Sequence, residues 1–302
     1  MYWDVGEYLS RLCANAAFGD KVIDEVASYI ASNGTAVKGF NRRGLYRMKQ
    51  FYETYRDDEF VTPLVTQISW TNHLLIMSGS KSTEERHFYM QLCADEHYSK
   101  RELARQMDSA YYERYMLSSK KPLPDIVPQN VRGGILDTYV LEFLDLPAQY
   151  SEQTFKKAII ANLKKFILEF GKDFSLIGEE YRVQVGGSDF YIDLLFYNRA
   201  LSCLVPVELK IGKFKPEHVG QINFYLEALD RDVKKQHENP SVGLVLCASK
   251  DDAVVEYALS RSISPTMVSD YTLYLPDKKI LQDKLRELAD IAMEQDGTGR
   301  SK

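Results

Sequence analysis

The chain has 302 residues, of which 45% are hydrophobic and 27% are charged, and its net charge is −5. This composition is typical of a soluble protein with a sizeable core, and the length suggests two domains. The acidic balance argues against a uniformly basic nucleic-acid coat. No apolar run approaches the roughly 18 residues that span a bilayer, and no signal peptide is visible at the start. We therefore expect a cytoplasmic location and no membrane partner.

The cysteines and histidines give no sign of a soft-metal site. Four cysteines lie far apart without a CxxC pair, and only five histidines occur, without an HExxH motif. Such spacing favours buried thiols in a reducing cytosol over a zinc site or a disulfide framework. We also expect no small-molecule organic cofactor. The cysteines are Cys13, Cys93, Cys203 and Cys247.

The first part of the chain has the apolar periodicity of helices. Ser82-x-x-Glu85 and Ser99-x-x-Glu102 are capping boxes, each ahead of an apolar run. No strand-like alternation of any length precedes residue 135. We therefore predict a mainly helical domain over residues 1–120. Its expected helices are Val5–Cys13, Val22–Ile30, Phe40–Tyr55, His87–Ala94 and Leu103–Met116.

One expected helix carries a local basic stripe. Six basic residues and one acid lie between Lys38 and Arg56, a local charge of +6 − 1 = +5 in an acidic protein. If the Phe40–Tyr55 helix enters a DNA groove, its basic side chains can reach phosphates or base edges. The alternative is a solvated basic face over an apolar underside. The candidate DNA-binding residues here are Arg42, Arg43, Arg47 and Lys49.

A linker and lead-in segment is expected over residues 121–147. Three prolines fall between Pro122 and Pro128, and such a segment cannot continue a helix. Ile135–Leu146 then predicts a short helix or lead-in segment.

Residues 148–302 predict an α/β domain in which a mixed sheet is flanked by helices. The helix, hairpin, strand, helix and strand follow in the order α-β-β-β-α-β, with two more helices and an edge strand added. The expected helices are Ser151–Phe170, Pro216–Leu229, Asp251–Ser260 and Lys279–Met293. The expected strands are Tyr181–Val185, Phe190–Tyr197, Leu201–Leu209, the central Val242–Ala248 and the edge strand Thr272–Leu275.

Two of these strands carry charge inside apolar sequence, namely Asp193, Glu208 and Lys210. Alternation places Tyr191, Asp193 and Leu195 on one face of their strand, and Glu208 and Lys210 on one face of theirs. Buried charges are costly unless they are paired or hold a metal. The order Asp, then Glu-x-Lys, resembles the PD-(D/E)xK nuclease superfamily.

Paired carboxylates at one sheet edge suit a hard cation. They repel each other, and a divalent ion between them removes that penalty. Mg²⁺ binds one or two carboxylates together with waters and phosphate oxygens, and we expect Mn²⁺ to substitute for it. The backbone carbonyl of Leu209 is a further candidate ligand. Lys210 would orient or deprotonate a water, or stabilise charge on the phosphate.

The superfamily resemblance implies further site residues. An acidic residue on the first core helix often joins the metal shell, which points to Glu169, with Glu179 and Glu180 as competitors. Gln221 and Tyr225 lie one turn apart on the next helix and resemble the additional motif of the resolvase-like branch, although Tyr225 is equally well placed for the core. Lys213 and Lys215 flank the start of that helix, where N–H groups also attract phosphate.

Longer motifs resemble the bacterial YhcG family of PDDEXK nuclease domain proteins over nearly the whole chain. They include Phe190-Tyr-Ile-Asp-Leu-Leu-Phe-Tyr197, Val207-Glu-Leu-Lys-Ile-Gly-Lys-Phe-Lys-Pro216, Gly220-Gln-Ile-Asn-Phe-Tyr-Leu226 and the N-terminal Tyr2-Trp-Asp-Val-Gly6. The resemblance implies a winged-helix-like N-terminal domain, a restriction-endonuclease-like C-terminal domain and action on DNA, in defence against foreign DNA or in processing of mobile elements. Relatives carry a further helical segment before the Tyr-Trp motif, so a short or truncated start is expected.

The function predicted from sequence is therefore a Mg²⁺-dependent deoxyribonuclease. Its partner is DNA, and a homodimer is expected because one site usually cuts one strand. Two alternatives stay open, a non-catalytic or partner-dependent DNA-binding protein and a ribonuclease.

Overall fold

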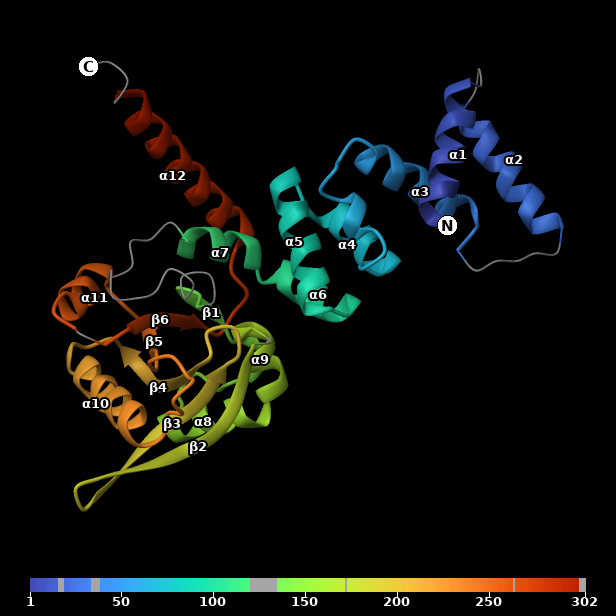
Figure 1. The fold of residues 1–302 in the computed structure, drawn as a ribbon. Helices are drawn as coiled ribbons and strands as arrows, with labels where there is room; N and C mark the ends of the chain where they lie inside the picture. The colour runs from blue at the N-terminus through green and yellow to red at the C-terminus, as the bar shows by residue number, and fades with distance from the viewer. Residues whose placement is uncertain (16–18, 34–38, 120–134, 172, 263, 299–302) are drawn as a thin grey trace. The chain divides into compact units, whose positions relative to one another are not determined.

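The computed structural model describes residues 1–15, 19–33, 39–119, 135–171, 173–262 and 264–298 (Figure 1). These fall into two compact units, Met1–Ala104 and Arg105–Lys302. Most of the expected proline-rich linker lies outside the described residues. The division falls before that segment, so helix α7 (Tyr111–Ser119) belongs to the second unit.

The first unit is helical, as expected. Its described residues contain no strand, so the β-hairpin wing implied by the resemblance is not found among them. Its helices are α1 (Tyr2–Asn15), α2 (Gly19–Ser32), α3 (Arg42–Tyr55), α4 (Trp70–Gly79), α5 (Thr83–Glu96) and the start of α6 (Lys100–Asp108), with the short 3-10 helix Thr62–Leu64.

Helices α1 and α3 pack in close contact. A Cβ atom on Gly6 would lie 2.1 Å from the Met48 carbonyl oxygen, so only glycine permits this approach. Trp3 packs edge-on against Phe51, with ring centroids 5.6 Å apart. The N-terminal Tyr-Trp motif therefore belongs to the core of this unit.

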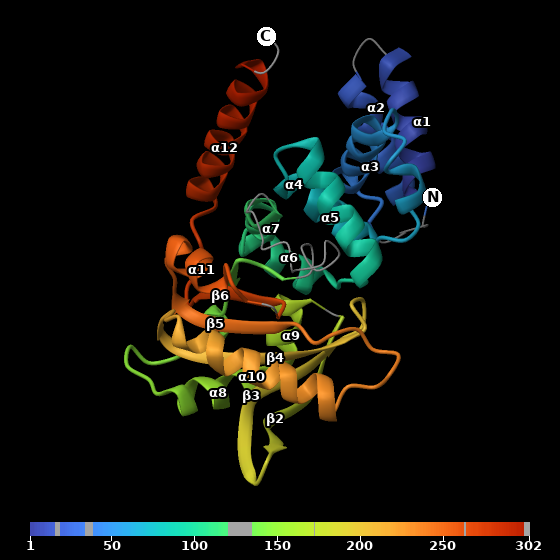
Figure 2. The ribbon, with the colours of Figure 1, turned by 60° about the vertical axis from the view of Figure 1, so that its left-hand side comes forward.

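The second unit contains a six-stranded mixed sheet in the order β1-β6-β5-β4-β3-β2 (Figure 2). The β1–β6, β6–β5 and β5–β4 pairs are parallel, and the β4–β3 and β3–β2 pairs are antiparallel. The strands are β1 (Thr138–Val140), β2 (Phe174–Val185), β3 (Ser188–Asn198), β4 (Cys203–Lys213), β5 (Gly243–Ser249) and β6 (Thr266–Thr272).

Helices cover both faces of this sheet, as Figure 2 shows. Phe155 and Phe166 belong to one buried core, and Ile222 and Leu259 to the other. The helices are α8 (Glu152–Ala161) and α9 (Leu163–Phe170) for the first core, and α10 (Glu217–Asp232) and α11 (Asp252–Leu259) for the second; α12 (Lys278–Thr298) follows. The predicted α-β-β-β-α-β order and the α/β class are confirmed.

Two predicted helices are each divided in the structure. The expected helix Ser151–Phe170 is broken at Asn162, whose φ of −112° and ψ of 25° are not helical. The expected helix Leu103–Met116 is broken at Ala110, whose φ is +52°. A continuous apolar stripe does not reveal such breaks, because both halves bury their apolar faces.

Two assignments around the far edge of the sheet were wrong. The segment expected as a short helix or lead-in forms strand β1, followed by a 3-10 turn at Glu142–Leu144. The expected edge strand Thr272–Leu275 is instead β6, which ends at Thr272 and lies between β5 and β1. Both segments are short, and pairing with distant strands rather than local propensity decides their conformation.

Candidate active site

The site lies where strands β3 and β4 diverge. Their antiparallel pairing runs from Asn198 with Cys203 to Leu194 with Val207. Asp193 and Glu208 occupy the next facing positions in this register, where no pair forms. Beyond them, β3 pairs with β2 alone and β4 pairs with β5. The fork therefore brings two carboxylates together at an opening in the sheet.

Strict alternation along β3 fails next to Asp193. Ile192 and Leu195 belong to the same core, whereas Leu194 belongs to the other. Regular alternation is therefore interrupted between Ile192 and Leu194, at Asp193. The partner strand is irregular at the same level, where Glu180 has a φ of +45°, and an irregular residue locally disrupts the alternation of a strand pair.

Both oxygens of Asp193 have partners. The backbone N–H of Leu209 donates to Oδ2 at 2.9 Å, and Lys156 Nζ lies 2.7 Å from Oδ1. In a β-strand the N–H and C=O of one residue point to the same side of the strand. The Leu209 carbonyl is therefore expected to point toward the fork, as the sequence-based assignment of this ligand requires.

Glu208 is buried with a 3% exposed fraction, and its Oε1 accepts from Lys210 Nζ at 2.8 Å. This contact confirms that the two side chains share a face. Burial, and then the charge of Asp193, raise the pKa of Glu208 to about 7. Its buried Oε2 has no hydrogen-bond partner, which leaves one carboxylate oxygen available to a ligand.

These donors fit a small hard cation. Within the described part of the chain, no group of three or more His, Cys, Asp or Glu side chains is arranged to hold a metal. Mg²⁺ needs only one or two carboxylates, because waters and substrate oxygens complete its octahedron. Asp193 and Glu208 meet that requirement, and an added cation would remove the cost of the orphaned, buried oxygen of Glu208.

Gln221 and Tyr225 meet as the sequence predicts. Gln221 Nε2 donates to the Tyr225 hydroxyl at 3.2 Å, and that hydroxyl donates to the Tyr191 carbonyl at 2.8 Å. Tyr225 thus ties α10 to β3 two residues before Asp193. It also lies in the core beneath α10, so it serves the packing and the site together.

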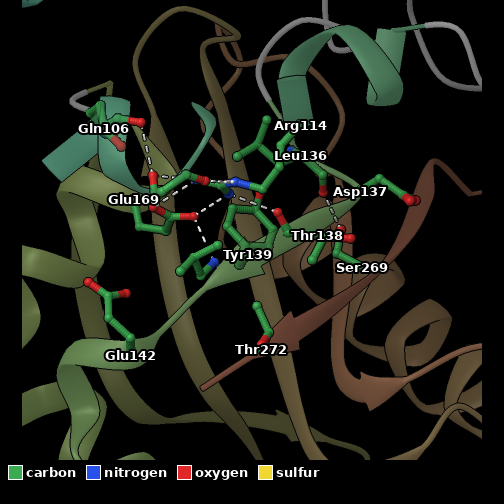
Figure 3. Close-up of polar contacts among 12 residues, drawn as sticks. Gln106, Arg114, Leu136, Asp137, Thr138, Tyr139, Glu142, Glu169, Ser269 and Thr272 are labelled. Atoms are coloured by element: carbon green, nitrogen blue, oxygen red, sulfur yellow. Dashed lines mark hydrogen bonds and ion pairs between the residues drawn. The ribbon is translucent and has the colours of Figure 1, made fainter. Parts of the chain in front are cut away.

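The structure does not bring Glu169 to the fork. This side chain is fully buried and accepts from Arg105 and from the Val140 N–H, each at 2.8 Å. It also accepts from Arg114 at 2.5 Å, a contact that Figure 3 shows. The expectation that Glu169 is a metal ligand is therefore wrong, because it contacts β1, which β6 and β5 separate from β4, where Glu208 lies. Arg105 comes from α6, and Arg114 from α7.

Glu152 is the helix carboxylate that lies near the site. The negative charge of Glu152 contributes to the raised pKa of Glu208, after the larger effects of burial and of the Asp193 charge. It occupies the first turn of α8, directly after the capping Ser151, and Lys156 follows one turn later. The four-residue spacing of Glu152 and Lys156 places both on one face of α8, and this spacing is the signal in the sequence that points to them.

The basic residues that we expect to contact DNA are exposed or only partly buried. Lys213 lies 4.0 Å from Asp251 and Lys215 lies 3.5 Å from Glu217, all with exposed side chains. On α3, Arg42 pairs with Asp24 and Lys49 pairs with Glu53, whereas Arg43 is exposed and Arg47 half-buried. Both sets keep cationic side chains at the surface of their own unit.

No described helix has the length and apolarity needed to cross a membrane. Two protein-family models match the chain. The YhcG PDDEXK nuclease domain matches residues 132–286, and the DUF1016 N-terminal domain matches residues 1–114. A curated protein of Escherichia coli (strain K12), named "Putative nuclease YhcG", is 39% identical over 214 residues. The match covers 68% of this chain and 56% of that protein, so the chain spans little more than half the length of this relative.

Two solved structures are also similar to part of the chain. A repair endonuclease from Pyrococcus abyssi covers 43% of this chain and 50% of its own, at 17% identity and a TM-score of 0.29. The match to the apo form of EndoMS covers 43% of this chain and 49% of the EndoMS chain, at 17% sequence identity and a TM-score of 0.28.

Proposed function

Because the chain belongs to the YhcG family of PDDEXK nuclease domain proteins, we propose that it is a Mg²⁺-dependent nuclease that hydrolyses phosphodiester bonds of DNA. One observation carries the proposal. Asp193 and Glu208 face each other at the β3–β4 fork, and one buried oxygen of Glu208 has no partner. A nuclease of this type needs such a carboxylate pair beside a lysine.

Asp193, Glu208 and the Leu209 carbonyl would hold the ion. When bound, Mg²⁺ lowers the pKa of a coordinated water and neutralises charge on the phosphate. Lys210, held by Glu208, places its ammonium beside the same site. There it donates a hydrogen bond to the phosphate oxygen on which negative charge grows, an interaction that is stronger in the transition state.

The remaining site residues position these groups. Tyr225 fixes the backbone of β3 at Tyr191, and Gln221 orients the Tyr225 hydroxyl. Lys213 and Lys215 place positive charge near the start of α10, where the backbone N–H groups also favour phosphate. We further propose that Arg43 and Arg47 on α3 contact the DNA backbone, so that the first unit also contributes binding energy.

The test is cleavage of linear, single-stranded and branched DNA, and of RNA, with Mg²⁺, Mn²⁺ or EDTA. Asp193→Asn and Glu208→Gln are expected to lower the rate at least about a hundredfold. Asp189→Asn, which changes an exposed carboxylate on the same strand, is the matched control and should cleave normally.

Each alternative has its own outcome in this assay. Cleavage that persists in both site variants would overturn the proposed site. Preferential cleavage of RNA would identify RNA as the substrate of the same metal-dependent phosphodiester hydrolysis. Salt-sensitive DNA binding without metal-dependent cleavage would favour the DNA-binding alternative.

A further inference from the structure

Lys156 lies between two carboxylates beside the fork. Its Nζ atom is 2.7 Å from Asp193 Oδ1 and 3.2 Å from Glu180 Oε1. The Lys156 and Asp193 side chains are 17% and 19% exposed, whereas Glu180 is 65% exposed. The ammonium therefore sits at the border between the buried site and solvent, and either carboxylate can hold it.

This contact and one backbone hydrogen bond occupy both oxygens of Asp193. One oxygen accepts from the Leu209 N–H and the other faces Lys156. A divalent ion on Asp193 would face a full positive charge at short distance, and like charges this close repel strongly outside bulk water. Lys156 must therefore leave Asp193 before the carboxylate can bind a metal well.

Glu180 provides the place to which it can go. The residue lies on β2 between Glu179, which pairs with Leu194, and Tyr181, which pairs with Ile192. This is the level of Asp193 on the neighbouring strand. Glu180 has a φ of +45°, a left-handed conformation that is costly for a residue other than glycine. A strained backbone thus holds a carboxylate within reach of Lys156.

We propose that Lys156 is a tethered counter-cation that neutralises Asp193 in the metal-free protein and transfers to Glu180 when a divalent ion binds. The inference rests on the proposed function only in that Asp193 and Glu208 hold the ion. The Lys156–Glu180 pair then sets the metal concentration at which the site fills. In this account Lys156 is a positioning residue, and Glu180 acts on the metal through Lys156.

The test is calorimetric titration of the full chain with Mn²⁺ alone. Lys156→Met removes the competing cation and is expected to tighten Mn²⁺ binding about tenfold. Glu180→Gln removes the alternative place for the ammonium and is expected to weaken it several-fold. In the double variant the Glu180 change should have no further effect, because its influence passes through Lys156.

Lys157→Met is the matched control. It removes the same charge from the next residue of α8, whose side chain is exposed, and should change Mn²⁺ affinity less than twofold. Additive effects of the Lys156 and Glu180 changes would overturn the proposal, since they would indicate general electrostatics. Equal effects of the Lys156 and Lys157 changes would overturn it as well.

The proposed function has a separate outcome. If the unaltered chain does not bind Mn²⁺, or if Asp193→Asn leaves its Mn²⁺ binding intact, the metal site itself is refuted. The counter-cation role then fails with it. If Asp193-dependent binding exists but Lys156→Met leaves the affinity unchanged, only the counter-cation role fails. Thermal unfolding of each variant checks the fold, and Glu180→Gln, at an exposed position, keeps the test usable if Lys156→Met is unstable.

Discussion

Asp193 and Glu208 face each other one step beyond the last paired residues of β3 and β4. The two strands separate at this point, so the carboxylates meet across a gap instead of across a continuous ladder. One side chain is engaged by the Leu209 N–H, and the other keeps a free, buried oxygen. The chemistry of the site follows from this fork.

Glu152 and Glu169 should respond differently to the same change. Glu169→Gln leaves Arg105 and Arg114 without their buried partner, and we expect a loss of about 3–5 kcal/mol in the free energy of unfolding. Glu152→Gln, at an exposed position, should leave stability unchanged and weaken Mn²⁺ binding. Denaturant unfolding and metal titration of both variants check this, and a stable Glu169→Gln chain with weakened metal binding would contradict the assignment.

The protonation of Glu208 should couple stability and metal binding to pH. Its pKa is raised to about 7 from the ordinary value of 4.5, so the folded chain binds more protons than the unfolded chain in that window. The metal-free protein should therefore lose stability as pH rises from 4.5 to about 7, by up to roughly 3 kcal/mol.

Metal affinity should instead increase as pH rises, because the ion binds the ionised form of the Glu208 carboxylate. Mn²⁺ affinity should rise about tenfold per pH unit below neutrality and level off above it. Unfolding and Mn²⁺ titrations across this range provide the measurement. Glu208→Gln should abolish the stability loss in the metal-free protein, and an unchanged pH profile in that variant would assign the titration to another group.

Tyr225→Phe removes the hydroxyl that holds the Tyr191 carbonyl and accepts from Gln221. The ring still fills the core, so stability should fall by only about 1 kcal/mol. Because the backbone before Asp193 becomes less fixed, we expect the cleavage rate to fall roughly tenfold with KM unchanged. Leu229→Ala, a core change on the same helix, controls for general loosening of α10. An equal kinetic effect of that variant would reduce Tyr225 to a packing residue.

Arg43 and Arg47 should contribute to DNA binding through phosphates. Replacing both with Ala is expected to weaken binding across sequences and to reduce the salt slope by about 1 per lost contact. Arg11→Ala, which removes one exposed cation on α1 that is paired with Glu7, is the control for each single Arg→Ala change. Binding that is unaltered in the double variant at low and high salt would leave α3 as a solvated basic face.

The order of elements and the central charged residues were predictable because they depend on local pattern. Short apolar runs identify β3 and β4, and the charged residues within them mark Asp193 and Glu208. A four-residue spacing on a helix places Gln221 and Tyr225 on one face whatever surrounds them. These predictions need only the period of the local structure, so the sequence by itself determines them.

The choice between Glu152 and Glu169 depended on tertiary structure. Both lie on the segment predicted as one helix, but Asn162 divides it, and the second half carries Glu169 to two arginines that are 64 and 55 residues away in sequence. Which carboxylate is neutralised by a distant cation, and which one reaches the fork, is a matter of non-local packing. The same holds for Lys156 on α8, whose partners lie on β2 and β3. It also holds for β1, which is a strand only because β6 lies beside it.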